Sequence, residues 1–134
     1  MTYFIDFWKD SRESADQNDG TALLKGKFVQ IRKGNEDYFV GSPKKLCKFH
    51  SDIVVLFGKT QGIETYKVPG NGPVEFVDSK WKVIGGGKIQ IDEETKHVLL
   101  SDSSQAYGSF ERKGIVRKLS SADRFPGYTF EVTD

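Results

Sequence analysis

Segments with the alternation typical of β-strands fill most of this chain. Only two helical segments separate them at irregular intervals, one after residue 42 and a short one at residues 120–125. The segments expected to be extended are residues 27–33, 37–40, 74–77, 80–84, 88–91, 96–100, 114–119 and 128–132. A parallel α/β fold needs a helix after nearly every strand, and this order does not provide one. We therefore predict an α+β fold, a single compact domain in which a mixed β-sheet of about six strands carries two packed helices.

The length of 134 residues fits one domain, and ten phenylalanines can supply one hydrophobic core. The first 20 residues differ from the rest, because they hold five acidic residues against two basic ones. We expect residues 1–20 to form an acidic, mobile N-terminal arm and residues 21–134 to form the folded domain.

The cysteine content and the N-terminus indicate a reducing compartment. Cys47 is the only cysteine, so no intramolecular disulfide can form. Asp6 and Asp10 interrupt the apolar residues at the start of the chain, which therefore lacks the pattern of a signal peptide. The longest apolar run, residues 53–57, is far shorter than the roughly 20 residues that cross a bilayer. We predict a cytoplasmic protein that does not interact with membranes.

The net charge of +1 argues against a strongly basic nucleic-acid-binding protein, but the charges are unevenly distributed. Residues 25–50 contain seven basic residues against two acidic ones, and residues 111–124 contain five against two. If these stretches meet, they would form a cleft that attracts anions. The alternative is that they are solvated lysines and arginines on unrelated faces. Aromatic residues among them could stack on nucleic-acid bases, but the core needs most of those rings, so nucleic acid is not an expected partner.

A helix is predicted after Ser42 and Pro43, because serine caps free amides and proline suits the first helical position. Its apolar stripe would be formed by Leu46, His50, Ile53 and Phe57. Gly58 or Gly62 would end it. His50 would then lie on or beside the buried face, where it could equally be a core-edge histidine whose ring is hydrogen-bonded to a backbone carbonyl group.

Three consecutive glycines at 85–87 interrupt a strand pattern. They predict a bulge, or a place where another backbone or a ligand approaches closely. They are not a P-loop, although Lys88 follows them, because the spacing of that motif is missing. Residues 101–108 are expected to form a polar loop.

Metal and thiol chemistry find no support in the sequence. Cys47 is not followed by an anion-binding loop that ends in arginine, so it is interpreted as a small core residue. Two histidines and one cysteine at unsuitable spacing do not predict a metal site, and the short chain leaves little room for a domain that binds a cofactor. We predict no metal and no cofactor.

Several short motifs occur together in one order. They are Lys-Phe-Val-Gln-Ile-Arg at 27–32, Phe-His-Ser-Asp-Ile at 49–53, Gly-Gly-Gly-Lys-Ile at 85–89, Ser-Gln-Ala-Tyr-Gly at 104–108 and Phe-Pro-Gly-Tyr-Thr-Phe-Glu-Val at 125–132. This series resembles the small protein histidine phosphatases, the Janus/Ocnus family, across residues 25–133. The resemblance implies a monomeric α+β protein that removes phosphate from phosphohistidine in a protein substrate, without a metal, and releases inorganic phosphate.

The resemblance also implies the residues of the site. His50 falls on the catalytic histidine of the family. The phosphate-binding residues would be Lys27, Lys88, Ser104, Gln105, Ala106 and Arg112. The sequence departs from the family where Lys88 stands in place of an arginine and Arg112 in place of a histidine. The family's arginine ahead of the helix has no clear match, and residues 64–74 look like an insertion.

Two mechanisms and a second function remain open from the sequence. His50 could activate water as a general base, or it could attack phosphorus itself. Burial and a helix N-terminus would lower its pKa, whereas a bound phosphate and carboxylates would raise it. Because Lys88 and Arg112 depart from the family, the chain could instead be a binding module of the same fold that holds a phosphorylated or acidic partner without turnover.

Overall fold

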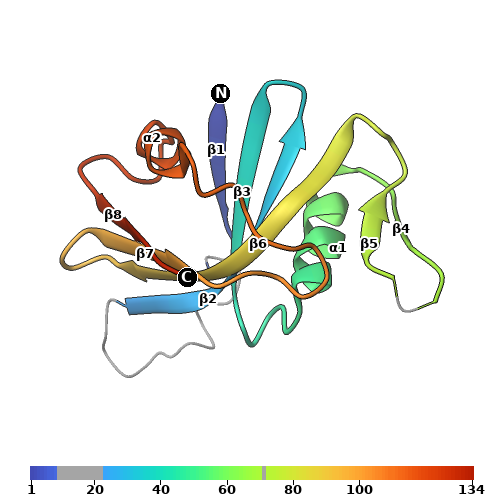
Figure 1. Ribbon diagram of the computed structural model, residues 1–134, viewed down its shortest axis with the longest axis horizontal. Helices are drawn as coiled ribbons and strands as arrows, with labels where there is room; N and C mark the ends of the chain where they lie inside the picture. Colours follow the sequence, from blue (N-terminus) through green and yellow to red (C-terminus); the bar gives the residue numbers. More distant parts are fainter. Residues whose placement is uncertain (9–22, 71) are drawn as a thin grey trace.

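The structure is a computed structural model, and it describes residues 1–8, 23–70 and 72–134 (Figure 1). In chain order its elements are β1 (Thr2–Asp6), β2 (Leu23–Lys33), β3 (Glu36–Pro43), α1 (His50–Gln61), β4 (Thr65–Lys67), β5 (Val74–Phe76), β6 (Trp81–Asp92), β7 (His97–Ser101), α2 (Ile115–Ser120) and β8 (Thr129–Val132). No helix within the described ranges combines the length and the apolar character that a membrane crossing requires.

Six strands form one mixed sheet in the order β1-β3-β2-β6-β7-β8, and β4 and β5 form a separate two-stranded hairpin. The central strands pair antiparallel, whereas the edge strands β1 and β8 run parallel to their neighbours β3 and β7. With one helix on each face, this architecture confirms the predicted α+β domain with a mixed sheet and two helices.

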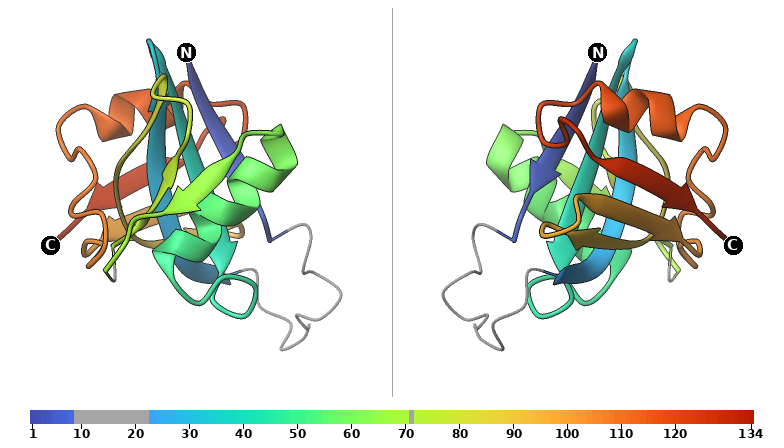
Figure 2. Two further views of the ribbon diagram at one scale, coloured as in Figure 1. Left: turned by 90° about the vertical axis from the view of Figure 1, so that its right-hand side faces the viewer. Right: turned by 90° about the vertical axis from the view of Figure 1, so that its left-hand side faces the viewer.

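The helices cover opposite faces of the sheet, as the side views in Figure 2 show. Side chains alternate along β2, so Phe28 packs in the cluster that contains α2 residues Ile115 and Leu119. Val29 packs in the other cluster, with Ile53 of α1. The odd-numbered residues of β2 therefore face α1. By the same alternation Lys25 and Lys27 lie on that face, near the start of α1.

The expectation of an acidic arm is wrong for the beginning of the chain. Thr2–Asp6 forms β1, which pairs with β3 along its whole length, and Phe7 and Trp8 after it are buried in the two cores. The acidic composition of residues 1–20 concealed this strand, although it holds only one acidic residue, Asp6, after the largely apolar Tyr3, Phe4 and Ile5. The remaining part of the expected arm, residues 9–22, lies outside the described residues.

The predicted start of the first helix is also wrong. Ser42 and Pro43 continue β3, where they are in register with Lys27 and Gly26 of β2. The strand ladder satisfies this part of the backbone, so the capping potential of Ser42 is not used. The helix begins at His50 and ends at Gln61, and Gly62 caps it with a φ of 71°, the left-handed conformation expected of a C-terminal glycine.

The sequence predicts a strand at residues 114–119 and the second helix at residues 120–125, but the helix α2 lies earlier, at Ile115–Ser120. A short apolar run does not by itself distinguish a strand from a helix. Here Ile115 and Leu119, four residues apart, are both buried against the sheet, as helical spacing requires. The two extended segments around the glycines, by contrast, form one continuous strand, β6.

Candidate active site at the start of helix α1

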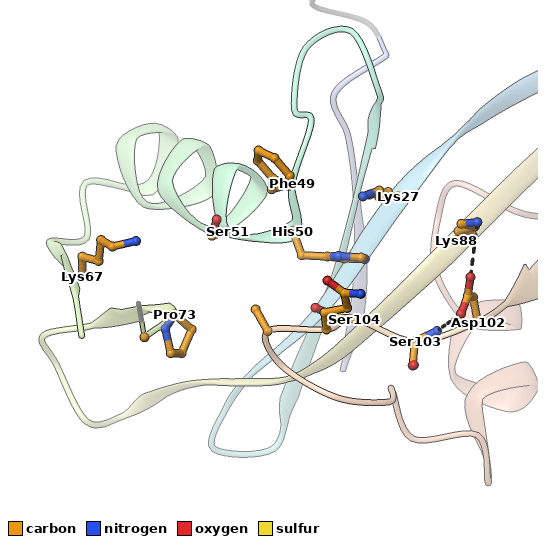
Figure 3. A pocket seen from close by; sticks show the side chains of 13 residues that line it. Lys27, Phe49, His50, Ser51, Lys67, Pro73, Lys88, Asp102, Ser103 and Ser104 are labelled. Atoms are coloured by element: carbon orange, nitrogen blue, oxygen red, sulfur yellow. Dashed lines mark hydrogen bonds and ion pairs between the residues drawn. The ribbon is translucent and has the colours of Figure 1, made fainter. Parts of the chain in front are cut away.

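A cleft of about 630 Å³ opens between the start of α1, strands β2 and β6, the loop after β7 and the β4–β5 hairpin (Figure 3). The sequence-predicted residues that line it are Lys27, His50, Lys88, Ser104, Gln105 and Ala106. These residues are up to 79 positions apart in the chain, from Lys27 to Ala106, and they come from four separate elements. The cleft thus unites six of the seven residues that the resemblance implies.

His50 is held at the first position of α1. Phe49 precedes it with extended backbone angles, φ −119° and ψ 157°, and donates its N–H to the carboxylate of Asp52 at 2.9 Å. Phe49 has no side-chain acceptor, so only this half of a capping box is present. The N-terminal end of the 12-residue helix, with its partial positive charge, therefore lies at the cleft beside Ser51.

The ring of His50 is fixed by β6. Its Nε2 lies 3.0 Å from the carbonyl oxygen of Gly87, and the side chain is buried. A carbonyl oxygen only accepts hydrogen bonds, so in the neutral ring Nε2 carries the proton and Nδ1 keeps the lone pair. Among the described residues no polar group contacts Nδ1. The hydrogen bond to a backbone carbonyl, an expected sign of a structural histidine, here selects the tautomer that leaves one nitrogen free.

The surroundings of His50 also keep the ring neutral. Burial lowers the pKa of His50 below its ordinary value of 6.5, and the positive charge of Lys27 acts in the same direction. The hydrogen bond to Gly87 and the charge of Asp102 oppose this shift without reversing it. At neutral pH, Nδ1 is therefore an unprotonated base on a side chain that lines a cationic cleft.

The glycines at 85–87 let other parts of the chain come close to β6. A Cβ atom at Gly85 would lie 2.1 Å from the carbonyl oxygen of Ser109, and one at Gly87 would lie 2.5 Å from that of Ser101. The strand also contains a bulge, because Gln30 of β2 pairs with Gly85 while Ile31 pairs with Val83. Both expectations for the triple glycine, a bulge and a close approach, are confirmed.

Gly86 makes room for the catalytic candidate itself, so Gly86→Ala is expected to displace His50. The added methyl group would lie 2.8 Å from Cδ2 of His50 and 2.6 Å from the backbone oxygen of Phe28. We expect a loss of about 1–3 kcal/mol in the free energy of unfolding and a changed NMR signal of the His50 ring. Urea denaturation and ¹H–¹³C spectra measure both effects.

The matched control is Gly114→Ala, because open space surrounds that position and only its φ of 81° opposes a side chain. It should cost about 1 kcal/mol and leave the His50 signal unchanged. Wild-type stability and an unshifted His50 signal in Gly86→Ala would contradict the close packing of this ring.

Two lysines lie directly opposite each other in the site. Lys27 of β2 is in register with Lys88 of β6, and like charges facing across a sheet are mutually repulsive. Asp102 partly neutralises the charge of Lys88, with 3.2 Å between Nζ of the lysine and Oδ2 of the aspartate. Both side chains are more than half exposed, so this ion pair is weak. The Nζ of Lys27 lies 5.9 Å from the ring centre of Phe49. A bound anion would relieve the repulsion between the two lysines.

The loop after β7 supplies backbone donors. Ser104 and Gly108 exchange two backbone hydrogen bonds of 3.0 and 2.8 Å, which closes a tight loop. Within the described part of the chain the N–H groups of Gln105 and Ala106 have no acceptor. Ser104 is buried, and its Oγ accepts the N–H of Tyr107 at 3.1 Å. Ser104 thus shapes the loop, while Gln105 and Ala106 offer free N–H groups at the cleft.

Arg112, the seventh residue of the predicted site, does not line the cleft. Its guanidinium group donates to Oγ of Ser109 and to the backbone oxygens of Asp102 and Thr133, and it stacks 4.4 Å from the ring centre of Phe110. These contacts connect the loop after β7 to the C-terminal segment. Arg112 therefore stabilises the wall of the cleft and is not placed to bind a ligand in it.

Several residues that line the cleft were not assigned to the site from the sequence: Phe49, Ser51, Lys67, Pro73 and Asp102. Lys67 and Pro73 belong to the β4–β5 hairpin, which the sequence suggested was only an insertion. Asp102 has a φ of 66°, a conformation that aspartate tolerates, but no spacing rule marks it. Across the three described ranges no group of at least three His, Cys, Asp or Glu side chains is arranged to hold a metal ion.

The sequence model described as the Janus/Ocnus family (Ocnus) matches residues 23–129, which is most of the chain. The chain belongs to the Janus/Ocnus family. No curated protein matches it. Every residue that lines the cleft lies within the Janus/Ocnus region, whereas β1 lies outside it.

Proposed function

We propose that this protein hydrolyses the phosphoryl–nitrogen bond of phosphohistidine in proteins, without a metal ion. One observation carries the proposal: His50, whose Nε2 is hydrogen-bonded to the carbonyl oxygen of Gly87 and whose pKa is lowered by burial, lines a cleft together with Lys27, Lys67 and Lys88. A neutral base surrounded by positive charge suits attack on a phosphoryl group, because the phosphoryl oxygens carry negative charge throughout the reaction.

In this mechanism Nδ1 of His50 accepts a proton from water while the water oxygen bonds to phosphorus. The phosphorus–nitrogen bond breaks, the proton passes to the leaving imidazole nitrogen, and the products are histidine and inorganic phosphate. Lys27 and Lys88 neutralise the phosphoryl oxygens, and the N–H groups of Gln105 and Ala106 donate to them. Direct attack by Nδ1 would instead leave a phosphoryl group on His50 before water releases it.

The test is release of phosphate from a phosphohistidine peptide in the presence of EDTA, with a phosphoserine peptide as the control substrate. Turnover of the phosphohistidine peptide alone is expected. Mass spectrometry after quenching in alkali distinguishes the two mechanisms, because only direct attack gives a phosphorylated His50. A phosphohistidine peptide that is bound but recovered intact after long incubation would contradict the enzyme and support the binding module.

The lowered pKa of His50 predicts the pH dependence of this activity. Only the neutral ring can accept a proton, so kcat/KM should fall as the pH drops through the pKa of His50 in the free enzyme. We expect the midpoint of this fall to lie below 6.5. The substrate phosphate also titrates, so an NMR titration of the His50 ring in the free protein gives an independent value. A midpoint above 6.5 in that titration would contradict a buried neutral base.

A further inference from the structure

A second, smaller groove of about 250 Å³ adjoins the cleft on the same face of the sheet. The basic side chains that line it are Lys25, Lys27, Lys44 and Lys88. Lys27 and Lys88 line the cleft as well, so the groove is a direct continuation of the candidate active site. Nothing in the mechanism above uses Lys25 or Lys44.

The register of the sheet sets the spacing between the lysines that line this groove. Lys25 and Lys27 are two positions apart on β2 and point to the same face, opposite Gln90 and Lys88 of β6. Two residues of a strand span about 7 Å. An extended peptide has the same spacing between alternate side chains. A peptide with one side chain in the cleft can therefore place the side chain two positions away beside Lys25.

The groove is uniformly cationic. None of the residues that line it carries a carboxylate, and the remaining ones are Gly26, Ile89 and Gln90. Asp102 is paired with Lys88, but it lines the cleft and not the groove. Lys25 and Lys44 are exposed and have no acidic partner among the described residues. No acidic side chain of the described ranges therefore neutralises the two charges.

We propose that this groove binds an acidic segment of the protein substrate, with a glutamate or aspartate two positions from the phosphohistidine. This inference rests on the proposed function, because it names the substrate class of the same site. An acidic peptide fits better than a free phosphate, since the groove continues the cleft along the strand direction and offers single charges at the spacing of a peptide. Lys25 and Lys44 act as substrate-binding residues that set specificity.

The experiment compares three phosphohistidine peptides, with Glu, Gln or Lys at the two positions located two residues before and after the phosphohistidine. The test variant is Lys25→Gln/Lys44→Gln, which keeps long polar side chains and removes only the charges. The control variant is Lys59→Gln/Lys113→Gln, because both of these lysines are exposed and neither lines the groove or the cleft. Phosphoramidate serves as a substrate without a peptide.

In the wild-type protein we expect KM for the Glu peptide to be about fivefold lower than for the Gln peptide at low salt. This difference should disappear in Lys25→Gln/Lys44→Gln and in 0.5 M salt, because exposed ion pairs are screened. The value of kcat and the hydrolysis of phosphoramidate should not change, since neither lysine contacts the phosphoryl group.

Equal KM values for the Glu and Gln peptides in the wild-type protein would overturn the inference. An equal loss of discrimination in Lys59→Gln/Lys113→Gln would overturn it too. If phosphoramidate and all peptides remain unhydrolysed, the proposed function fails. NMR titration with the unphosphorylated peptides then tests separately whether the groove binds an acidic peptide. Chemical-shift changes at Lys25 and Lys44 that only the Glu peptide causes would support the inference that the groove binds acidic peptides. Tighter binding of an oligonucleotide in the groove would overturn this inference.

Discussion

Replacing His50 with alanine is expected to reduce kcat/KM for a phosphohistidine peptide by about 10³-fold, which is the usual effect of removing a general base. The loss should appear in kcat, because Lys27, Lys88 and the backbone donors of the loop after β7 remain to bind the substrate. Phosphate release under saturating substrate measures kcat. Circular dichroism and the melting temperature check the fold of the variant, which we expect to be retained because the change removes one hydrogen bond, the one to Gly87.

The matched control is His97→Ala. His97 lies on β7, half exposed, where its ring contacts Thr129 at 2.7 Å and Glu131 at 3.4 Å, and it does not line the cleft. Its removal should leave turnover unchanged. A His50→Ala protein that keeps the wild-type rate would exclude His50 as the reacting residue and with it the proposed mechanism.

The largest effect on stability is expected from Asp37, whose carboxylate is almost fully buried away from the cleft. Arg32 binds it with two hydrogen bonds of 2.6 and 3.1 Å, and Lys118 of α2 also pairs with it. Asp37→Ala should lower the free energy of unfolding by about 3 kcal/mol and the melting temperature by about 10 °C. The loss is limited because Arg32 also pairs with Glu111 at 2.6 Å.

The pH dependence of this effect has a defined sign. Burial acts to raise the pKa of Asp37, but the hydrogen bonds from Arg32 and Lys118 outweigh it, so the pKa lies below its ordinary value of 3.8. The stabilisation is therefore complete above pH 3.8 and is lost as the pH falls through the lower pKa of the folded state. The stability difference between the wild-type protein and Asp37→Ala should shrink over that acidic interval.

Glu111→Gln is the control for Asp37→Ala, since Glu111 belongs to the same network but is 44% exposed at its side chain. It should cost less than about 1 kcal/mol. Both variants should retain activity below their melting temperatures. Equal losses of stability in the two variants would contradict the dominant role of the buried carboxylate.

Most strands of this protein were predictable because alternation is local, but β1 and β4 were missed. The two errors in the helices had non-local causes. Ser42 and Pro43 carry a helix-start signal, but pairing with β2 satisfies their backbone. Ile115 and Leu119 carry an apolar pattern that suits either element, and only the sheet beneath them decides for a helix.

The residues of the candidate site also fall into two groups, those that local motifs identify and those that non-local contacts place. His50, Lys27 and the loop at 104–106 were identified through motifs, and the structure brings them together. The position of Arg112 outside the cleft depends on hydrogen bonds to the backbone oxygens of Asp102 and Thr133, and Lys67 enters through a hairpin whose path no motif describes. Contacts of this kind depend on the tertiary structure, and the spacing of residues along the chain does not predict them.

Strand β1 has a practical consequence for where the domain is taken to begin. The family match starts at residue 23, yet a protein trimmed to that boundary would lose β1, Phe7 and Trp8. The indole of Trp8 fills space that Gly26 and Gly41 leave open, since a Cβ atom there would lie 2.9 and 2.7 Å from it. Trimming would leave a void in the core and bare the hydrogen-bonding edge of β3, a template for association between copies.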